Sequence, residues 1–358
     1  MYSHITYPEA IVVGLIQGVT ELFPVSSLGH NVLIPALVGG RWAVDLNVSA
    51  PESPYLAFIV GMHVATALAM IIYFWRDWLR IVKAFFASVA HVISPAPGTQ
   101  RWAPQDTDQK LAWMIILATI PVGIAGLALE HDFRVYFSKP TLTAVFLAVN
   151  GVILLAGEAV RRRRATLDQR QSAEDREVAA VAVPGAQGAG RHASGQRALK
   201  QQEADLAVQA DRRLTQVGWL TAFGLGAAQI LALLPGISRD GVVMVSGMFR
   251  GLSRQDAARF SFLLSAPVIL AAGALKVSDL TGPLGDGSRG QVLAGSILSG
   301  VGAYLALRFF MRYLSDPTRT LTPFAIYCLV VGIGSAIYLG ISLLRGTASG
   351  TVLRCVPI

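Results

Sequence analysis

Long apolar stretches alternate with short polar segments along most of the chain. Each stretch holds about 20 residues, the length a helix needs to cross roughly 30 Å of hydrocarbon at 1.5 Å per residue. The six stretches lie near residues 55–75, 111–130, 140–160, 258–276, 291–311 and 322–344. The pattern predicts an all-α polytopic membrane protein with about six spanning helices.

Two further apolar segments, residues 8–38 and 214–250, are too long for one ordinary helix. Each is interrupted by a polar tip that contains proline: GLIQGVTELFPVSSLGH in the first and GLGAAQILALLPGISRDG in the second. We expect two re-entrant hairpins, each made of two half-helices, that enter the membrane from opposite faces. Paired interrupted segments indicate an inverted-topology repeat with a site near the midplane of the membrane.

Residues 161–213 break the pattern. They begin with RRRR, are rich in Gln, Ala, Glu, Arg and Gly, and contain no aromatic residue. This composition buries too little apolar surface to offset the cost of ordering, so we expect a mostly disordered basic insertion, with a short helix near 196–213 as an option. The insertion would separate a first membrane repeat, residues 1–160, from a second, residues 214–358.

The composition fits this class, with 53% hydrophobic and 15% charged residues. The net charge of +8 comes from Lys and Arg that gather in alternate loops, which by the positive-inside rule places 76–110 and 161–213 in the cytoplasm. The charge therefore describes orientation, and we do not expect a nucleic-acid partner. The two cysteines, Cys328 and Cys355, support neither a disulfide framework nor a thiolate metal site.

The first tip carries polar side chains where lipid-facing sequence should be apolar. Gln17 and Glu21 share one helix face, and a buried carboxylate is a base, a metal ligand or a packing anchor. Ser26 and Ser27 follow Pro24 at the start of a half-helix, where free N–H groups favour an anion, although a capping role is the alternative. His30, one turn after Ser27, is a base, acid or nucleophile, or a packing residue.

In the second tip, Arg239 stands between LLPGIS and GVVMV. A guanidinium stays charged and must meet an anion there, either phosphate oxygens or a carboxylate such as Glu21 or Asp240. Gly236 and Gly241 would let the backbone approach a phosphate closely. Together the two tips predict a site for cleaving a phosphoanhydride.

These residues also carry a resemblance. QGVTELFPVSSLGH resembles the (E/Q)xxxE plus PVSSxGH signature of the undecaprenyl-diphosphate phosphatase family, the bacitracin-resistance type, and LLPGISRDG resembles its PGxSRSG signature. The segment YLAFIVGMHVATALAMIIYFW is similar to the third segment of that family, with an HxGT-like element at 63–66. Gln17, Leu28, Ala65 and Asp240 depart from the usual pattern.

The resemblance implies a multi-pass enzyme of the bacterial plasma (inner) membrane that hydrolyses undecaprenyl diphosphate to undecaprenyl phosphate and inorganic phosphate. This reaction recycles the lipid carrier for cell-wall synthesis. The resemblance further implies a site open to the extracytoplasmic side and a divalent cation, Mg²⁺ or Ca²⁺. We expect a polyprenyl diphosphate substrate and membrane lipids as partners, with a homodimer left open.

Four residues are predicted to be catalytic: Glu21, Ser27, His30 and Arg239. Five are predicted to bind the substrate: Gln17, Ser26, Gly236, Ser238 and Gly241. Glu21 and Gln17 are the candidate metal ligands. Ser27 is preferred as the nucleophile with His30 taking its proton, although a water activated by Glu21 fits the same residues.

The main alternative is a transporter or flippase of a phosphorylated lipid carrier or organic anion, because inverted repeats with broken helices are transporter architecture. A transporter needs compensating charge but no nucleophile, so it leaves the serine and histidine grouping unexplained. Lipid phosphatases of the acid-phosphatase type are disfavoured, since the chain has no KxxxxxxRP run.

Overall fold

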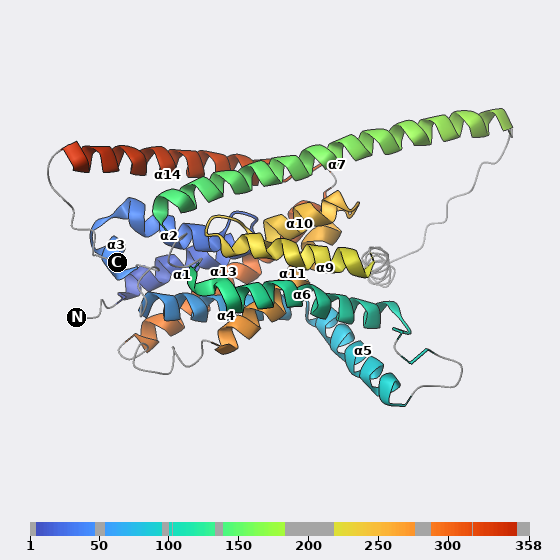
Figure 1. Ribbon diagram of the computed structural model, residues 1–358, viewed down its shortest axis with the longest axis horizontal. Helices are drawn as coiled ribbons and strands as arrows, with labels where there is room; N and C mark the ends of the chain where they lie inside the picture. The colour runs from blue at the N-terminus through green and yellow to red at the C-terminus, as the bar shows by residue number, and fades with distance from the viewer. Residues whose placement is uncertain are drawn as a thin grey trace, which may run out of the picture.

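The computed structural model describes residues 5–46, 54–94, 100–101, 103–132, 139–182, 218–275, 288–316 and 318–348. All regular elements in these ranges are helices (Figure 1). They are α1 (Tyr7–Leu22), α2 (Ser27–Val38), α3 (Gly40–Asp45), α4 (Pro54–Tyr73), α5 (Trp75–Ile93), α6 (Thr107–Asp132), α7 (Pro140–Ala182), α9 (Trp219–Ala228), η2 (Gln229–Leu233), α10 (Arg239–Phe249), α11 (Arg254–Leu275), α13 (Arg289–Ser315) and α14 (Thr322–Ala348).

Five of these helices are long and apolar enough to cross a membrane: α6, α7, α11, α13 and α14. A sixth candidate is the pair formed by α4 and α5, which is bent by 86° at its break. Each predicted apolar stretch falls within one of these helices, so the prediction of an all-α polytopic membrane protein is confirmed.

Pairs of short helices occupy the two segments predicted to be re-entrant. In the first, Thr6 caps α1, because its side chain accepts the N–H of Glu9 while the Glu9 carboxylate accepts the N–H of Thr6. Helix α1 ends at Leu22, just before Pro24, and α2 begins at Ser27. In the second, α9 and η2 end before Pro235, and α10 follows. Residues 214–217 of the predicted second hairpin lie outside the described residues.

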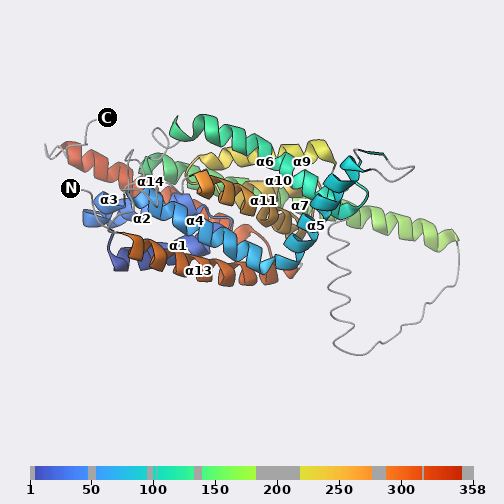
Figure 2. The same ribbon diagram turned by 90° about the horizontal axis from the view of Figure 1, so that it is seen from below.

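Helices from the two halves of the chain pack against each other. Helix α1 packs on α13, α9 packs on α6, and α7 packs on α14 (Figures 1 and 2). Helices α2 and α10 both contact α7. In each of these pairs a helix of one half packs on a helix of the other half, as an inverted repeat would lead us to expect. The repeat itself stays a prediction.

The α1–α13 contact is close because small residues line it. A Cβ atom on Gly14 would lie 2.5 Å from the carbonyl oxygen of Gly295, and one on Gly18 would clash with the carbonyl oxygen of Ser299. Small residues let helix backbones approach in membranes, where association depends on packing. This contact holds the last turn of α1, and therefore Glu21, at a fixed depth in the bundle.

Helix α7 crosses the predicted boundary at residue 160, and the division of the chain into two repeats and an insertion stays a prediction. Helix α7 continues through the four arginines to Ala182, so residues 161–182 are helical where the composition predicted mostly disorder. Arg164 accounts for part of this extension, because its guanidinium donates to the carbonyl oxygen of Phe249 at 2.6 Å. The predicted short helix near 196–213 lies outside the described residues.

Replacing Gly18 with alanine should loosen the α1–α13 contact. The added methyl group meets backbone atoms that cannot turn away, so we expect destabilisation of about 1–3 kcal/mol, measured by thermal unfolding in detergent. Gly126→Ala in α6 is the matched control, because nothing lies within 4 Å of a Cβ atom there. Equal effects from the two substitutions would contradict the close contact.

Candidate active site

The tips of the two hairpins meet inside the bundle. A Cβ atom on Gly29 would lie 2.9 Å from the Cα atom of Gly236, so only a glycine fits. The N–H of Gly236 donates to the Ser26 hydroxyl oxygen at 3.2 Å. Asn150 of α7 joins both tips: its amide donates to the Pro24 carbonyl oxygen at 2.9 Å and accepts the N–H of Ser238 at 3.0 Å. The predicted meeting of the tips is therefore present in the structure.

Ser26 shapes the first tip. Its backbone lies in the left-handed region, with φ of 67°, the one such non-glycine residue in the described part of the chain. Its hydroxyl oxygen also accepts the N–H of Gly29 at 3.2 Å, and its carbonyl oxygen accepts a hydrogen bond from His30 Nδ1 at 2.7 Å. Strained backbone of this kind persists where the surroundings hold it, and it concentrates at functional sites.

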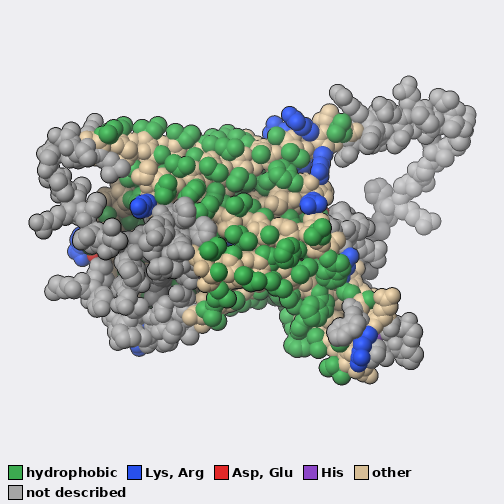
Figure 3. All heavy atoms as spheres, in the orientation of Figure 1, with side chains coloured by type: hydrophobic (Ala, Val, Ile, Leu, Met, Phe, Trp, Pro, Cys, Tyr) green, Lys and Arg blue, Asp and Glu red, His purple; other side chains and the backbone are tan. Residues whose placement is uncertain are grey.

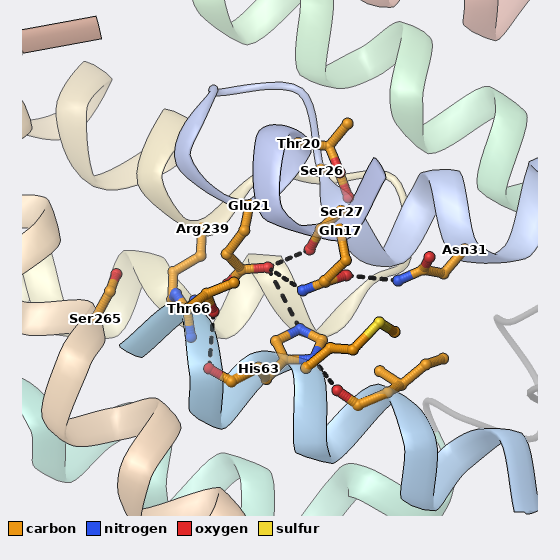
Figure 4. A network of polar contacts seen from close by, with 12 residues as sticks. Gln17, Thr20, Glu21, Ser26, Ser27, Asn31, His63, Thr66, Arg239 and Ser265 are labelled. Atoms are coloured by element: carbon orange, nitrogen blue, oxygen red, sulfur yellow. Dashed lines mark hydrogen bonds and ion pairs between the residues drawn. The ribbon is translucent and has the colours of Figure 1, made fainter. Parts of the chain in front are cut away.

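Glu21 lies at the centre of a buried polar network (Figure 4). One carboxylate oxygen, Oε1, accepts from Arg239 Nη2 at 2.6 Å. The other, Oε2, accepts from Gln17 Nε2 at 2.9 Å and from the Ser27 hydroxyl, and lies 3.4 Å from His63 Nε2. The carboxylate is thus surrounded by donors on both oxygens, which offsets the cost of burying its charge.

The amide of Gln17 has a fixed orientation in this network. Its oxygen accepts from Asn31 Nδ2 at 2.6 Å, so its nitrogen is turned toward Glu21. A glutamine therefore serves as a neutral donor where a second acid would repel Glu21. This gives a physical reason for the departure from an acidic residue at this position.

His63 is a member of the centre that the sequence analysis did not include among the site residues. Its Nδ1 donates to the carbonyl oxygen of Ile59 at 2.9 Å, so Nε2 can donate toward Glu21 only as the imidazolium. The available signal was a histidine in the middle of an apolar helix, within the HxGT-like element, where it was given no chemical role.

Arg239 carries the positive charge that faces Glu21. It begins α10, where Ser238 caps the helix by accepting the N–H of Gly241 at 3.1 Å. Its side chain is 19% exposed against 4% for that of Glu21, and its Nε is buried without a hydrogen-bond partner. Arg239 thus makes one hydrogen bond with its five N–H donors and keeps a partly exposed side chain, which a phosphate oxygen could approach.

The unusual acid beside Arg239 is turned away from the centre. Asp240 accepts hydroxyl hydrogen bonds from Ser261 and Ser265 of α11, both at 2.7 Å. Both serines come from outside the two tips. Asp240 therefore anchors α10 to α11, while the ion pair to Arg239 is made by Glu21.

The structure brings four of the predicted residues together: Gln17, Glu21, Ser27 and Arg239. It does not join His30 to the Ser27 hydroxyl. The His30 ring stacks on Tyr327, its Nε2 lies 2.7 Å from the Tyr327 hydroxyl, and its Nδ1 binds the Ser26 carbonyl oxygen. The expected proton transfer from Ser27 to His30 therefore needs correction, because Ser27 donates to Glu21 instead.

The remaining predicted residues make the junction between the tips: Ser26, Gly236, Ser238 and Gly241. The amides of Gly236 and Gly241 already donate to serine hydroxyl oxygens. Their part in binding a substrate stays a prediction. Within the described ranges, no group of three His, Cys, Asp or Glu side chains is arranged to hold a metal ion by itself.

The comparisons with known proteins agree on one family. The model of the bacitracin resistance protein BacA family matches residues 10–334. A protein of Mycolicibacterium paratuberculosis named undecaprenyl-diphosphatase is 54% identical over 341 residues, covering 95% of this chain and 100% of the relative. One from Mycobacterium avium is 53% identical over 341 residues with the same coverage, and undecaprenyl-diphosphatase 1 of Frankia casuarinae is 48% identical over 383 residues, again at 95% and 100%.

Removing the positive charge of Arg239 should leave Glu21 buried without its arginine partner. We expect Arg239→Met to destabilise the protein by about 3–5 kcal/mol, measured by thermal unfolding in detergent. The double variant Glu21→Gln/Arg239→Met removes both charges and should recover most of the loss. Strictly additive losses in the double variant would show that the two side chains do not depend on each other.

Proposed function

The chain belongs to the bacitracin resistance protein BacA family and hydrolyses undecaprenyl diphosphate, and we propose that the reaction takes place at the buried centre around Glu21. The observation that carries the proposal is the bond from the Ser27 hydroxyl to the Glu21 carboxylate. A hydroxyl beside a base, with the base oriented by further groups, is the arrangement of an activated nucleophile. Gln17 and Arg239 orient the base here.

When the substrate enters, Arg239 can bind either the Glu21 carboxylate or a phosphate group of the diphosphate. Its partly exposed guanidinium, which makes one hydrogen bond to Glu21, can also bind one phosphate group of the diphosphate. As the guanidinium turns toward the phosphate, Glu21 loses part of its stabilising charge and becomes a stronger base toward Ser27. Substrate binding would thus activate the nucleophile at the moment it is needed.

The first step then forms a bond from Ser27 Oγ to the terminal phosphorus. The bond from that phosphorus to the bridging oxygen breaks, and undecaprenyl phosphate leaves with the bridging oxygen. The Ser27 proton passes to Glu21, and the His63 imidazolium gives a proton to the leaving oxygen. His63 takes this role in place of His30 because it faces the carboxylate directly.

The second step releases inorganic phosphate. Water attacks the phosphoserine, His63 accepts the water proton, and the Ser27 oxygen recovers its proton from Glu21. Both groups return to their starting protonation states, so the cycle is closed. His30 acts through Ser26 in this account, since its Nδ1–H fixes the strained turn that presents Ser27.

A divalent cation remains part of the proposal. Mg²⁺ commonly binds through one or two carboxylates together with substrate phosphates, and Glu21 offers one carboxylate. The Gln17 amide turns its nitrogen to Glu21 and its oxygen to Asn31, so Gln17 would join Glu21 as a ligand only after its amide turns over. The Glu21 carboxylate fits a cation that arrives with the diphosphate. When bound, it would neutralise charge on the non-bridging oxygens.

The orientation in the membrane is also proposed. Most of the Lys and Arg atoms visible in Figure 3 lie at the end of the bundle to which α5 and the extension of α7 reach, and the positive-inside rule assigns that end to the cytoplasm. The insertion that begins with the four arginines would then be cytoplasmic. The centre would open to the extracytoplasmic side. Association of two copies stays an expectation.

Replacing the reacting groups should abolish hydrolysis. We expect Glu21→Gln, Ser27→Ala and Arg239→Ala each to lower phosphate release from undecaprenyl diphosphate in detergent by about 10²–10⁴-fold. Ser299→Ala, a buried serine of α13 outside the centre, should retain normal activity. No release by folded wild-type protein would favour a transporter.

The nucleophile can be identified directly. With substrate labelled in the terminal phosphate, acid quenching should trap the label on the wild-type protein and leave none on Ser27→Ala. Trapped label on His30 would return that residue to the nucleophile's role. Activity of Ser27→Ala within tenfold of wild type would favour attack by a water activated by Glu21.

Removal of divalent cations should stop hydrolysis without unfolding the protein. A chelator is expected to abolish phosphate release, and Mg²⁺ or Ca²⁺ should restore it. The melting temperature without substrate should not change, because the proposed cation binds together with the diphosphate. A large fall in melting temperature on chelation would indicate a resident structural metal instead.

A further inference from the structure

Helix α5 lies across the direction of the spanning helices. Its axis makes an angle of 86° with that of α4, and the break falls at Phe74 (Figure 2). Asp77 near its start accepts from Arg259 Nη2 of α11 at 2.8 Å, and Arg80 Nε lies 3.5 Å from Asp108 of α6. These ion pairs fix the bend, so α5 is held nearly at right angles to α4.

Three different faces run along α5. One face, formed by Ile81, Ala84 and Ser88, is buried, and Trp113 of α6 donates to the Ser88 hydroxyl at 2.9 Å. Arg76 and Lys83 lie exposed on the second face. The third is a continuous exposed apolar stripe at helical spacing, made of Trp75, Leu79, Val82, Phe86 and Ile93. A helix with one apolar and one basic face typically lies in the plane of a membrane interface.

An apolar cavity opens between α5, α6 and α9. Its volume is about 670 Å³, within the range of about 300–1,000 Å³ that is usual for small-ligand sites. Its walls include Val89, Val92, Leu117, Trp113 and Trp219. Val89 and Val92 lie beside the apolar stripe of α5, so the cavity continues that surface inward. Arg101 closes one side, with its Nε donating to the Val92 carbonyl oxygen at 2.8 Å.

The basic side chains at this end of the bundle favour an anionic lipid as the occupant of the cavity. Arg76 and Lys83 of α5 and Arg101 of the cavity wall are exposed. Figure 3 shows most of the visible Lys and Arg atoms toward the end of the bundle to which α5 reaches. Each basic residue near a membrane surface favours anionic lipid. Tryptophan is also typical of the membrane interface, and Trp113 and Trp219 line the cavity while Trp75 lies exposed at the start of α5.

We infer that α5 is an interfacial helix and that the cavity beneath it binds one acyl chain of an anionic phospholipid, with the lipid phosphate near Arg101. Arg76 and Lys83 lie farther along α5 and face anionic headgroups of the surrounding leaflet. The apolar stripe of α5 enters the acyl region of the same leaflet. The lipid chain fills the space that a helix lying across the bundle leaves between itself and the spanning helices. This site is separate from the centre around Glu21 and does not rest on the proposed reaction.

The lipid site can be tested on the full chain in detergent by native mass spectrometry with added dioleoyl phosphatidylglycerol or dioleoyl phosphatidylcholine. We expect preferential retention of phosphatidylglycerol. Leu117→Trp, which fills the cavity, should lower retention by about tenfold, an effect of the size expected for lost burial of part of an acyl chain. Ile124→Trp, on the same helix but outside the cavity, is the matched control. Equal retention by Leu117→Trp and wild type would overturn the proposal.

The headgroup preference has its own variant, which also covers a failure of Leu117→Trp to fold. Arg101→Gln should weaken phosphatidylglycerol retention by about fivefold and leave phosphatidylcholine unchanged. Equal retention of the two lipids by wild type would overturn the choice of an anionic lipid.

The position of α5 is tested in vesicles of phosphatidylglycerol. In a Cys328→Ser/Cys355→Ser background, Lys83→Cys should react with a membrane-impermeant maleimide about tenfold faster than Phe86→Cys, because the second position enters the acyl region. Equal rates would place the stripe in water and would point to a protein partner instead.

Discussion

The ion pair between Glu21 and Arg239 is the interaction on which the rest of the architecture depends. A carboxylate and a guanidinium in the interior of a membrane bundle are each costly alone, and each makes the other tolerable. They come from segments 218 residues apart, one at the end of α1 and one at the start of α10. The close α1–α13 contact fixes the end of α1, and the hydrogen bonds of Asn150 join the two tips. Both features bring the two helix ends to the same point.

Much of this arrangement could be predicted from the sequence. Interrupted apolar segments predicted the two short-helix pairs, and a lone arginine between apolar residues predicted an anionic partner, with Glu21 among the candidates. What local spacing could not give was the direction of each side chain. His30 follows Ser27 by three residues, and this spacing predicted that His30 would take the Ser27 proton. The His30 ring instead stacks on Tyr327, which lies 297 residues away in the sequence. His63 and Asn150 joined the site through the same kind of distant contact.

Helix α5 and the extension of α7 illustrate a second limit. Residues 76–110 were interpreted as a loop because they lie between two apolar stretches and carry basic residues. Residues 161–182 were expected to be mostly disordered because of their composition. The structure has α5 in the first range and the extension of α7 in the second, and charged residues of both bind other elements, through Asp77 to Arg259 and through Arg164 to the end of α10. Composition alone does not show which distant residues a charged side chain will bind.

The junction of the two tips also bears on how the protein is made. A ribosome that has completed α7 has produced Glu21, Ser27 and Asn150, but not the arginine that neutralises the acid or the glycine that packs against Gly29. The first half of the chain therefore enters the membrane with a carboxylate that lacks its arginine partner and with a tip that lacks the glycine packed against Gly29. The centre is complete only after Arg239 has been synthesised and inserted, so the nascent enzyme is inactive during most of its translation.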